Sequence, residues 1–333
     1  MNNKKSFCSI CCQIFFALFL CSCGNSLDNK MDNVSSKNDD EKQIYIPIIA
    51  KGWQQQYWQS VKMGAEKAAK DYNVRITFEA PEGDASINKQ IEIIDSALSK
   101  KPAAIILAAG DRKSVIPQLE KAKAANIPVI IFDADVDSNI PITTVATGNA
   151  GASSAAADKL ATAICQEGEV AVICHDPDSV SSTGTERRDG FVNRIKDEYP
   201  KIKIVDVEYG GGDHAVSEIL TKKIIEKYPN IKGIFATNEG SAYGLINGVI
   251  QNDKVGKIAI VGFDAGKVQK DAVRNGIMLG AISQTPVQMG YKAVEAAYEV
   301  SNGEKIQSII DTGYIWYDKT NIDNEDMKPL LYD

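Results

Sequence analysis

The sequence contains few of the residues on which metal and nucleophilic chemistry usually depend. Only two histidines, His175 and His214, occur in 333 residues, and of seven cysteines only Cys165 and Cys174 follow residue 23. These two cysteines lack CxxC spacing and cannot complete a tetrahedral metal site by themselves. We therefore expect no metal and no cofactor, and we expect both histidines to be ordinary polar positions. Whether the two cysteines pair stays open.

The motifs of several enzyme classes are also missing. The sequence has no GxxxxGK[ST] loop, no GxGxxG after a predicted strand, no GxSxG and no HExxH. The net charge of −7 disfavours nucleic-acid binding, which requires a clustered basic surface. The protein is therefore predicted to be neither an enzyme nor a nucleic-acid-binding protein.

The N-terminus has the pattern of an export signal. Lys4 and Lys5 precede the apolar run IFFALFL at residues 14–20, which is short for a membrane span of about 20 residues. The sequence LCSC at residues 20–23 resembles a bacterial lipobox, which implies cleavage before Cys23 and attachment of lipid to it. We expect residues 1–22 to be a lipoprotein signal peptide and the protein to be extracytoplasmic and anchored to a membrane.

A polar segment separates this signal from the folded part of the chain. Residues 23–42 are rich in Asn, Ser, Asp and Lys and almost lack apolar side chains, so they cannot bury enough surface to fold. We expect them to be a flexible tether.

From residue 44 onward, short apolar runs alternate with segments of helical periodicity. This pattern predicts an α/β protein with parallel sheets covered on both faces, and the length of the chain favours two doubly wound lobes. The predicted strands are residues 44–50, 74–80, 103–109, 128–134, 169–175, 203–209, 231–237, 257–264 and 280–286.

Polar and aromatic side chains gather where these strands end, which is where parallel sheets bind ligands. The stretch KGWQQQYWQS at residues 51–60 follows the first strand and combines aromatic rings with amides, a mixture suited to a small polar molecule. Asp133, Asn238, Asp264 and Gln284 end later strands. Each also has an ordinary explanation, because Asp and Asn commonly cap helices and Trp58 can simply pack on a helix face.

Six stretches, in order, are similar to the type I periplasmic binding proteins, in particular the ribose and galactose binders of ABC transporters. They are YWQSVKMGAEKAA, ANIPVIIFDAD, TGTERRDGF, IFATNEGSAYGLI, IAIVGFDAG and GAISQTPVQMG. The resemblance covers about residues 43–320 and implies two lobes joined by three crossing strands. It places residues 43–147 and 285–312 in an N-terminal lobe, and residues 148–284 and 313–333 in a C-terminal lobe.

The resemblance also implies which residues bind the ligand. Tyr57 and Trp58 match paired aromatics that sandwich a sugar ring, and Arg187 matches the arginine of the R-x-x-G-F motif. The polar ligands of the sugar hydroxyls are expected to be Gln55, Asp133, Asn238, Asp264 and Gln284. One departure is that Ala134 follows Asp133 where ribose-type binders often have arginine, so Lys51 or Gln54 is a possible substitute for that cation and the identity of the sugar stays open.

The function that the resemblance implies is capture of a monosaccharide or polyol between two closing lobes and its delivery to an ABC transporter permease. We expect a monomer. Alternatives are a sensor-coupled binding protein for a sugar-like signal, or a nucleoside or amino-acid binder with the same fold. The effector domain of a repressor is disfavoured because residues 1–42 resemble an export signal rather than a DNA-binding helix-turn-helix.

Overall fold

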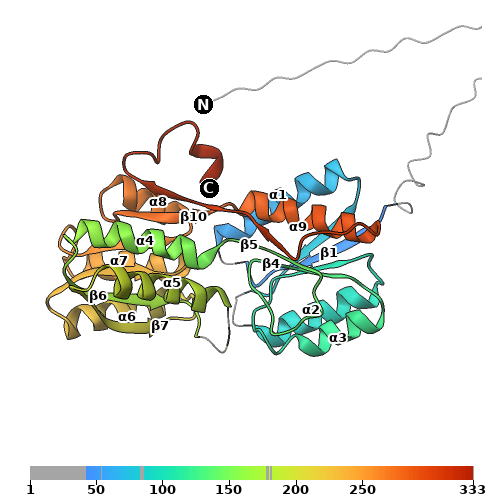
Figure 1. Ribbon diagram of the computed structural model, residues 1–333, viewed down its shortest axis with the longest axis horizontal. Helices are drawn as coiled ribbons and strands as arrows, with labels where there is room; N and C mark the ends of the chain where they lie inside the picture. The colour runs from blue at the N-terminus through green and yellow to red at the C-terminus, as the bar shows by residue number, and fades with distance from the viewer. Residues whose placement is uncertain (1–42, 54, 83–85, 178–179, 181, 333) are drawn as a thin grey trace, which may run out of the picture. The chain divides into compact units, whose positions relative to one another are not determined.

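The computed structural model describes residues 43–332 apart from residues 54, 83–85, 178–179 and 181. The predicted signal peptide, the tether, Cys23 and Gln54 lie outside the described residues. Within the described part, two six-stranded sheets are flanked by helices (Figure 1), which confirms the predicted α/β class. Cys165 is exposed, Cys174 is buried, and both are free thiols.

The first sheet has the strand order β11-β5-β4-β3-β1-β2, and all its neighbouring strands are parallel. We call the part of the chain built on this sheet lobe 1. Its strands are β1 (Tyr45–Ile49), β2 (Arg75–Glu79), β3 (Ile105–Leu107), β4 (Val129–Phe132), β5 (Thr143–Ala146) and β11 (Ile309–Asp311). Its helices are α1 (Gln56–Asp71), α2 (Ile87–Ser99), α3 (Ile116–Ala124) and α9 (Pro286–Ser301).

The second sheet has the order β12-β10-β9-β8-β6-β7, and only its edge strand β12 is antiparallel to its neighbour. This sheet defines lobe 2. Its strands are β6 (Gly168–Cys174), β7 (Ile202–Tyr209), β8 (Ile231–Ala236), β9 (Ala259–Phe263), β10 (Gly280–Gln284) and β12 (Tyr314–Asp318). Its helices are α4 (Asn149–Ala163), α5 (Ser182–Glu198), α6 (His214–Lys227), α7 (Glu239–Gln251), α8 (Lys267–Arg274) and the short η1 (Lys328–Leu330).

The central strands form the core because helices cover both faces of each sheet. Every residue of β1 and β4 is buried, as expected for continuous apolar strands of a parallel sheet. In lobe 1, α1 and α9 lie side by side (Figure 1), and Gly64 makes their close approach possible. A Cβ atom at Gly64 would lie 1.8 Å from the Val287 carbonyl oxygen, so any larger residue there would push the helices apart.

The chain passes between the two sheets after β5, after β10 and after β11. Strands β5 and β11, which are short and lack a long apolar run, were not predicted from the sequence, and β12 was also missed, although it contains the apolar run YIWY. Their burial is partial, and Ile309 in β11 is 67% exposed. The lobe boundaries expected at residues 147/148, 284/285 and 312/313 remain our proposal for where each lobe begins and ends.

Candidate functional site

One cavity between the two lobes brings together all eight residues that the sequence predicted as ligand-binding. Lobe 1 contributes Gln55, Tyr57, Trp58 and Asp133, and lobe 2 contributes Arg187, Asn238, Asp264 and Gln284. All eight are buried. Lys51, His175 and Thr183 line the same cavity. Lining residues lie at the C-terminal ends of six strands, namely β1, β4, β6, β8, β9 and β10. The carboxyl edges of both sheets therefore face this space.

The two aspartates of the site occupy corresponding positions, each directly after a central strand. Asp133 follows β4 and Asp264 follows β9, and both have left-handed backbone conformations, with φ of 60° and 79°. Each backbone N–H remains bonded to the neighbouring strand, Asp133 to Val145 O at 2.9 Å and Asp264 to Ile282 O at 2.6 Å. This conformation is uncommon for residues other than glycine and is often found at functional sites. The turn therefore directs each carboxylate into the space between the lobes.

Donors within the protein hold the Asp264 carboxylate. Gln284 Nε2 donates to Oδ1 at 2.7 Å, and the backbone N–H of Glu239 donates to Oδ2 at 2.9 Å. Burial raises the pKa of Asp264, while the Arg187 guanidinium acts in the opposite direction. Glu239 is the first residue of α7, so its bond to Asp264 is the helix-capping contact that the sequence left as an alternative. Asp264 therefore caps this helix and also lines the cavity.

Tyr57 connects the first turn of α1 to the other aspartate. Its hydroxyl donates to Asp133 Oδ1 at 2.7 Å. Burial, reinforced by the Asp133 carboxylate, raises the pKa of Tyr57 well above its ordinary value, so the phenol stays protonated. This bond fixes the orientation of the carboxylate that the cavity presents.

Arg187 is oriented from three sides. Its Nε donates to Asn149 Oδ1 at 2.7 Å, its Nη1 donates to the Thr237 carbonyl at 2.9 Å, and its guanidinium lies 3.8 Å from the centre of the Phe263 ring. Because a guanidinium carries five N–H donors, these two bonds leave further donors for a molecule in the cavity. Glu186 supports this arrangement by accepting a hydrogen bond from Asn149 Nδ2 at 3.1 Å.

The two aromatic residues do not form the expected sandwich. The rings of Tyr57 and Trp58 lie 5.0 Å apart at an interplanar angle of 78°, in an edge-to-face contact that leaves no space for a sugar between them. They form one aromatic wall of the cavity instead. Trp58 is only 2% exposed, and its Nε1 has no hydrogen-bond partner among the described residues.

His175 is a site residue that the sequence analysis treated as an ordinary strand end. Its Nδ1 and Nε2 lie 2.8 Å and 3.1 Å from the hydroxyls of Thr237 and Thr183. Burial, followed by the charges of Arg187 and Lys51, lowers the pKa of His175 well below its ordinary value. The imidazole is therefore neutral. Its position after β6 is the same strand-end signal that identified Asp133 and Asp264, and it could have been used.

The described conformation is closed. Lys51 Nζ of lobe 1 lies 3.5 Å from Asp176 Oδ2 of lobe 2, and the backbone N–H of Asp135 donates to Ser182 Oγ across the cleft at 3.0 Å. The cavity has a volume of only about 20 Å³, which is too small for a monosaccharide. A ligand can therefore enter only when the lobes separate.

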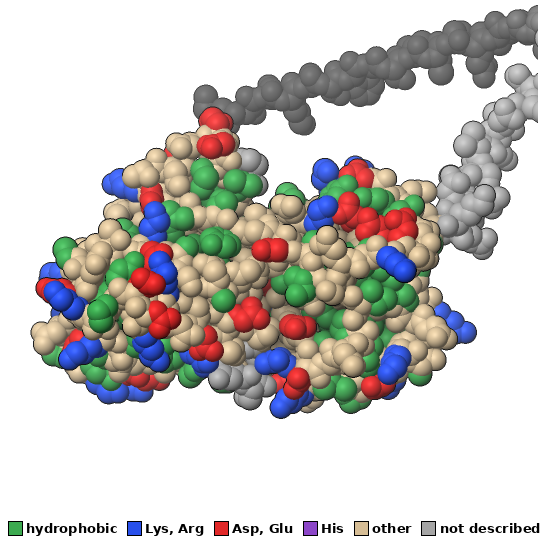
Figure 2. All heavy atoms as spheres, in the orientation of Figure 1, with side chains coloured by type: hydrophobic (Ala, Val, Ile, Leu, Met, Phe, Trp, Pro, Cys, Tyr) green, Lys and Arg blue, Asp and Glu red, His purple; other side chains and the backbone are tan. Residues whose placement is uncertain are grey.

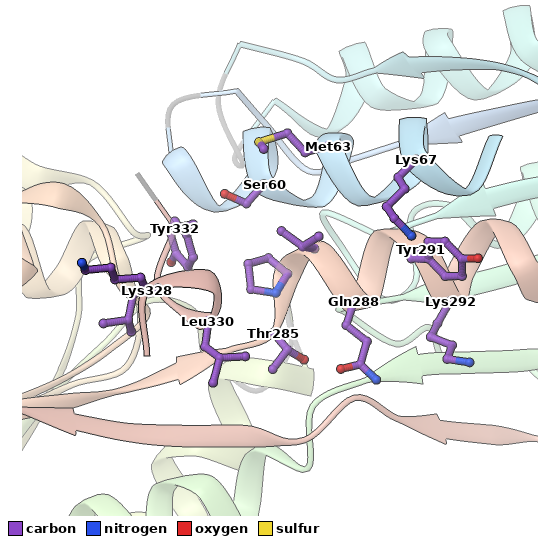
Figure 3. A pocket seen from close by; sticks show the side chains of 13 residues that line it. Ser60, Met63, Lys67, Thr285, Gln288, Tyr291, Lys292, Lys328, Leu330 and Tyr332 are labelled. Atoms are coloured by element: carbon purple, nitrogen blue, oxygen red, sulfur yellow. The ribbon is translucent and has the colours of Figure 1, made fainter. Parts of the chain in front are cut away.

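A larger groove of about 650 Å³ lies elsewhere and shares no lining residue with this cavity. Figure 3 shows Ser60, Met63 and Lys67 from α1 on one side of it and Gln288 and Tyr291 from α9 on another. The C-terminal segment completes its lining with Lys328, Leu330, Leu331 and Tyr332. The groove lacks carboxylates, so the smaller cavity is the better candidate for recognition of a polar molecule.

Other kinds of site have little support in the described part of the chain. No group of three or more His, Cys, Asp or Glu side chains there could hold a metal ion. None of the described helices is both long enough and apolar enough to span a membrane. On the face shown in Figure 2, Lys and Arg side chains are scattered among Asp and Glu and form no continuous basic patch.

Comparison with known proteins identifies the family. Residues 46–305 match the family model described as periplasmic binding protein domain, and the chain belongs to this family. It is 24% identical to the ribose import binding protein of Bacillus subtilis over 275 residues, covering 83% of this chain and 87% of the relative. It is 26% identical to a D-apiose import binding protein of Actinobacillus succinogenes, covering 76% and 79% of the two chains.

Solved structures agree with this assignment. A carbohydrate transporter solute-binding protein from Agrobacterium radiobacter, in complex with D-arabinose, has 31% identity and a TM-score of 0.83, with coverage of 87% of this chain and 99% of that chain. An ABC transporter solute-binding protein from Agrobacterium vitis with bound D-fucose has 30% identity and a TM-score of 0.82, with coverage of 86% and 100%. The two-lobed fold predicted by resemblance is thus confirmed.

Proposed function

We propose that the protein is an extracytoplasmic solute-binding protein that captures a monosaccharide or polyol between its lobes and delivers it to an ABC transporter permease. The observation that carries this proposal is the closed cavity lined by polar side chains from both lobes. Binding of one small molecule by both lobes at once stabilises the closed conformation. The protein's relatives include import binding proteins for ribose and D-apiose, which supports the same class of ligand and no enzymatic activity.

The charges that line the cavity favour a ligand without net charge. Two cations, Lys51 and Arg187, and two carboxylates, Asp133 and Asp264, are among the lining residues, and His175 is neutral. Sugar hydroxyls suit such a site because each can donate to a carboxylate and accept from a cation. The C–H groups of a sugar ring can pack on the aromatic wall formed by Tyr57 and Trp58.

We further propose that the eight predicted residues contact the ligand and that Lys51 compensates for the arginine replaced by Ala134. Lys51 lies at the end of β1 and lines the cavity. Its ammonium group forms an ion pair with the Asp176 carboxylate of lobe 2. This pairing differs from a lone cation and supports selection of a neutral ligand.

A thermal-shift screen tests the class of ligand. The panel contains neutral five- and six-carbon sugars, polyols, nucleosides and amino acids. A ligand that binds only the native state adds about 2.7 kcal/mol at 100 times its Kd, so for a domain of this size a matching sugar or polyol should raise the Tm by roughly 4 °C. Stabilisation by amino acids or nucleosides alone would contradict the proposed function.

We also propose that Cys23 carries lipid and that residues 23–42 tether the binding domain to a membrane. Cys23→Ala should then move the protein from the membrane fraction to the soluble fraction without changing sugar affinity, because the site residues lie between residues 51 and 284. Fractionation followed by mass spectrometry of the N-terminal peptide checks both points. Finding the wild-type protein wholly soluble and free of lipid would show that the lipobox assignment is wrong.

A further inference from the structure

Helix α1 carries two site residues in its first turn but lacks a cap of its own. It begins at Gln56, directly before Tyr57 and Trp58. The side chain of Gln55, at the N-cap position, makes no capping hydrogen bond, and the first turn contains no acidic residue. The first backbone N–H groups of a helix need acceptors from elsewhere. The position of the aromatic wall therefore depends on what accepts those N–H groups.

The acceptor comes from the opposite lobe. The backbone N–H of Gln56 donates to Glu239 Oε1 of lobe 2 at 3.3 Å. The other carboxylate oxygen, Oε2, is buried and has no hydrogen-bond partner among the described residues. Glu239 does not line the ligand cavity, but its own backbone N–H holds Asp264. One residue thus connects the first turn of α1 with a carboxylate of the site.

At the start of α8, in lobe 2, a side chain of lobe 1 provides the acceptor. The backbone N–H of Lys267, the first residue of this lobe 2 helix, donates to Gln56 Oε1 of lobe 1 at 2.6 Å. The N-cap position is Gly266, which has no side chain to cap with. A Cβ atom there would lie 2.7 Å from Glu239 Cδ, so glycine also provides the space that Glu239 occupies. Each lobe therefore supplies the cap that a helix of the other lobe lacks.

We propose that Glu239 and Gln56 are positioning residues that cap α1 and α8 across the cleft, so that closure of the lobes completes both helix ends and fixes the aromatic wall of the ligand site. The proposal rests on the proposed function for the identity of the ligand, but the capping pair acts on closure itself. Neither side chain lines the ligand cavity.

The surroundings of Glu239 make this closure sensitive to pH. Burial, followed by the Asp264 charge, raises the pKa of Glu239 to about 7 in the closed conformation. Tyr317 and Tyr332 face the same region, and burial raises the pKa of both, so they stay neutral. Opening the lobes exposes Glu239 to water and returns its pKa toward the ordinary value. Closure therefore takes up a proton, and its favourable contribution is present at low pH and lost as pH rises through about 7.

The test measures sugar affinity and lobe closure between pH 8 and pH 5.5 for the wild type, Glu239→Gln and Glu239→Ala. Because the pKa of Glu239 is about 7 in the closed conformation and ordinary in the open one, wild-type affinity should rise roughly thirtyfold as pH falls over this range. Both variants should show little dependence on pH. Glutamine keeps a carbonyl oxygen as the cap, so Glu239→Gln should bind about threefold to thirtyfold more tightly than Glu239→Ala at every pH. Rescue by glutamine separates capping from a general structural role.

Two further measurements keep the result unambiguous. His214 and Lys267 line a separate pocket together with Glu239. If Glu239 is the titrating group, His214→Asn should retain the wild-type pH response. Small-angle scattering without ligand should show a smaller radius of gyration at pH 5.5 than at pH 8 for the wild type, with no change for Glu239→Gln. If no sugar of the panel binds, the scattering comparison of the wild type with Glu239→Gln tests the proposal without a ligand. An equal pH response in the wild type and Glu239→Gln would overturn the proposal.

Discussion

Replacing Arg187 by alanine is expected to weaken sugar binding by about 30-fold to several-thousand-fold. Arg187 is 3% exposed, and its orientation by Asn149, the Thr237 carbonyl and the Phe263 ring leaves the remaining N–H donors facing the cavity. Removing one partner of a buried, charge-assisted hydrogen bond costs roughly 2–5 kcal/mol, because the other partner stays buried and unsatisfied. At about 1.4 kcal/mol per tenfold change in Kd, this energy gives the expected range. Isothermal titration calorimetry with the sugar identified by the screen measures it.

The matched control is Lys196→Ala, which removes an exposed cation from the same helix, α5. It should bind sugar like the wild type. Glu186 is not a suitable control, because it holds Asn149 and so supports Arg187 indirectly. Circular dichroism and thermal unfolding without ligand establish that Arg187→Ala is folded. A folded Arg187→Ala variant with wild-type affinity would show that the guanidinium does not bind the ligand.

Replacing Asp264 by asparagine is expected to have an effect of similar size, again roughly 2–5 kcal/mol in binding free energy. Asparagine tolerates the left-handed backbone at this position better than alanine does, so the change mainly removes charge. The amide group of asparagine also places a donor where Gln284 Nε2 and the Glu239 N–H now donate to two carboxylate oxygens. The variant therefore loses a charged acceptor for the ligand and part of the support of that acceptor.

Asp253→Asn provides a control of the same chemistry. Asp253 also has a left-handed backbone, with φ of 53°, but it is exposed and does not line the cavity. Its replacement should leave both the Tm and the Kd nearly unchanged. Calorimetry on the two variants gives the comparison, and equal sugar affinities for Asp264→Asn and the wild type would exclude Asp264 from recognition.

Local sequence patterns predicted the fold class and the region of the candidate site, whereas Arg187 and the ligand roles of the individual residues came from the family resemblance. A buried strand must be apolar along its whole length, so each strand of a parallel sheet can be recognised from its own segment of the sequence. Because parallel strands end at one edge, polar residues such as Asp133 and Asp264 could be assigned to a common region without knowledge of their distances. The short strands β5 and β11 were not predicted. Because they are only partly buried, their sequences do not form the continuous apolar runs of the central strands.

The role of His175 shows a different limit. Its strand-end position was visible in the sequence, but its neutral state depends on Thr183, Thr237 and nearby cations from other elements. No sequence pattern records those neighbours. The same reasoning applies to Thr183, which becomes part of the site only because the start of α5 lies against the end of β6.

By itself, the sequence determined that parallel-sheet lobes would bring polar strand ends together in one region, because strand burial and strand polarity are local properties. Tertiary structure decided how the side chains meet there. The edge-to-face geometry of Tyr57 and Trp58 follows from the packing of α1 rather than from their adjacency in the sequence. The bond from Gln56 to Glu239 joins residues 183 positions apart, and it exists only where the two lobes close on each other, because its short range requires both helix ends to arrive at the same place.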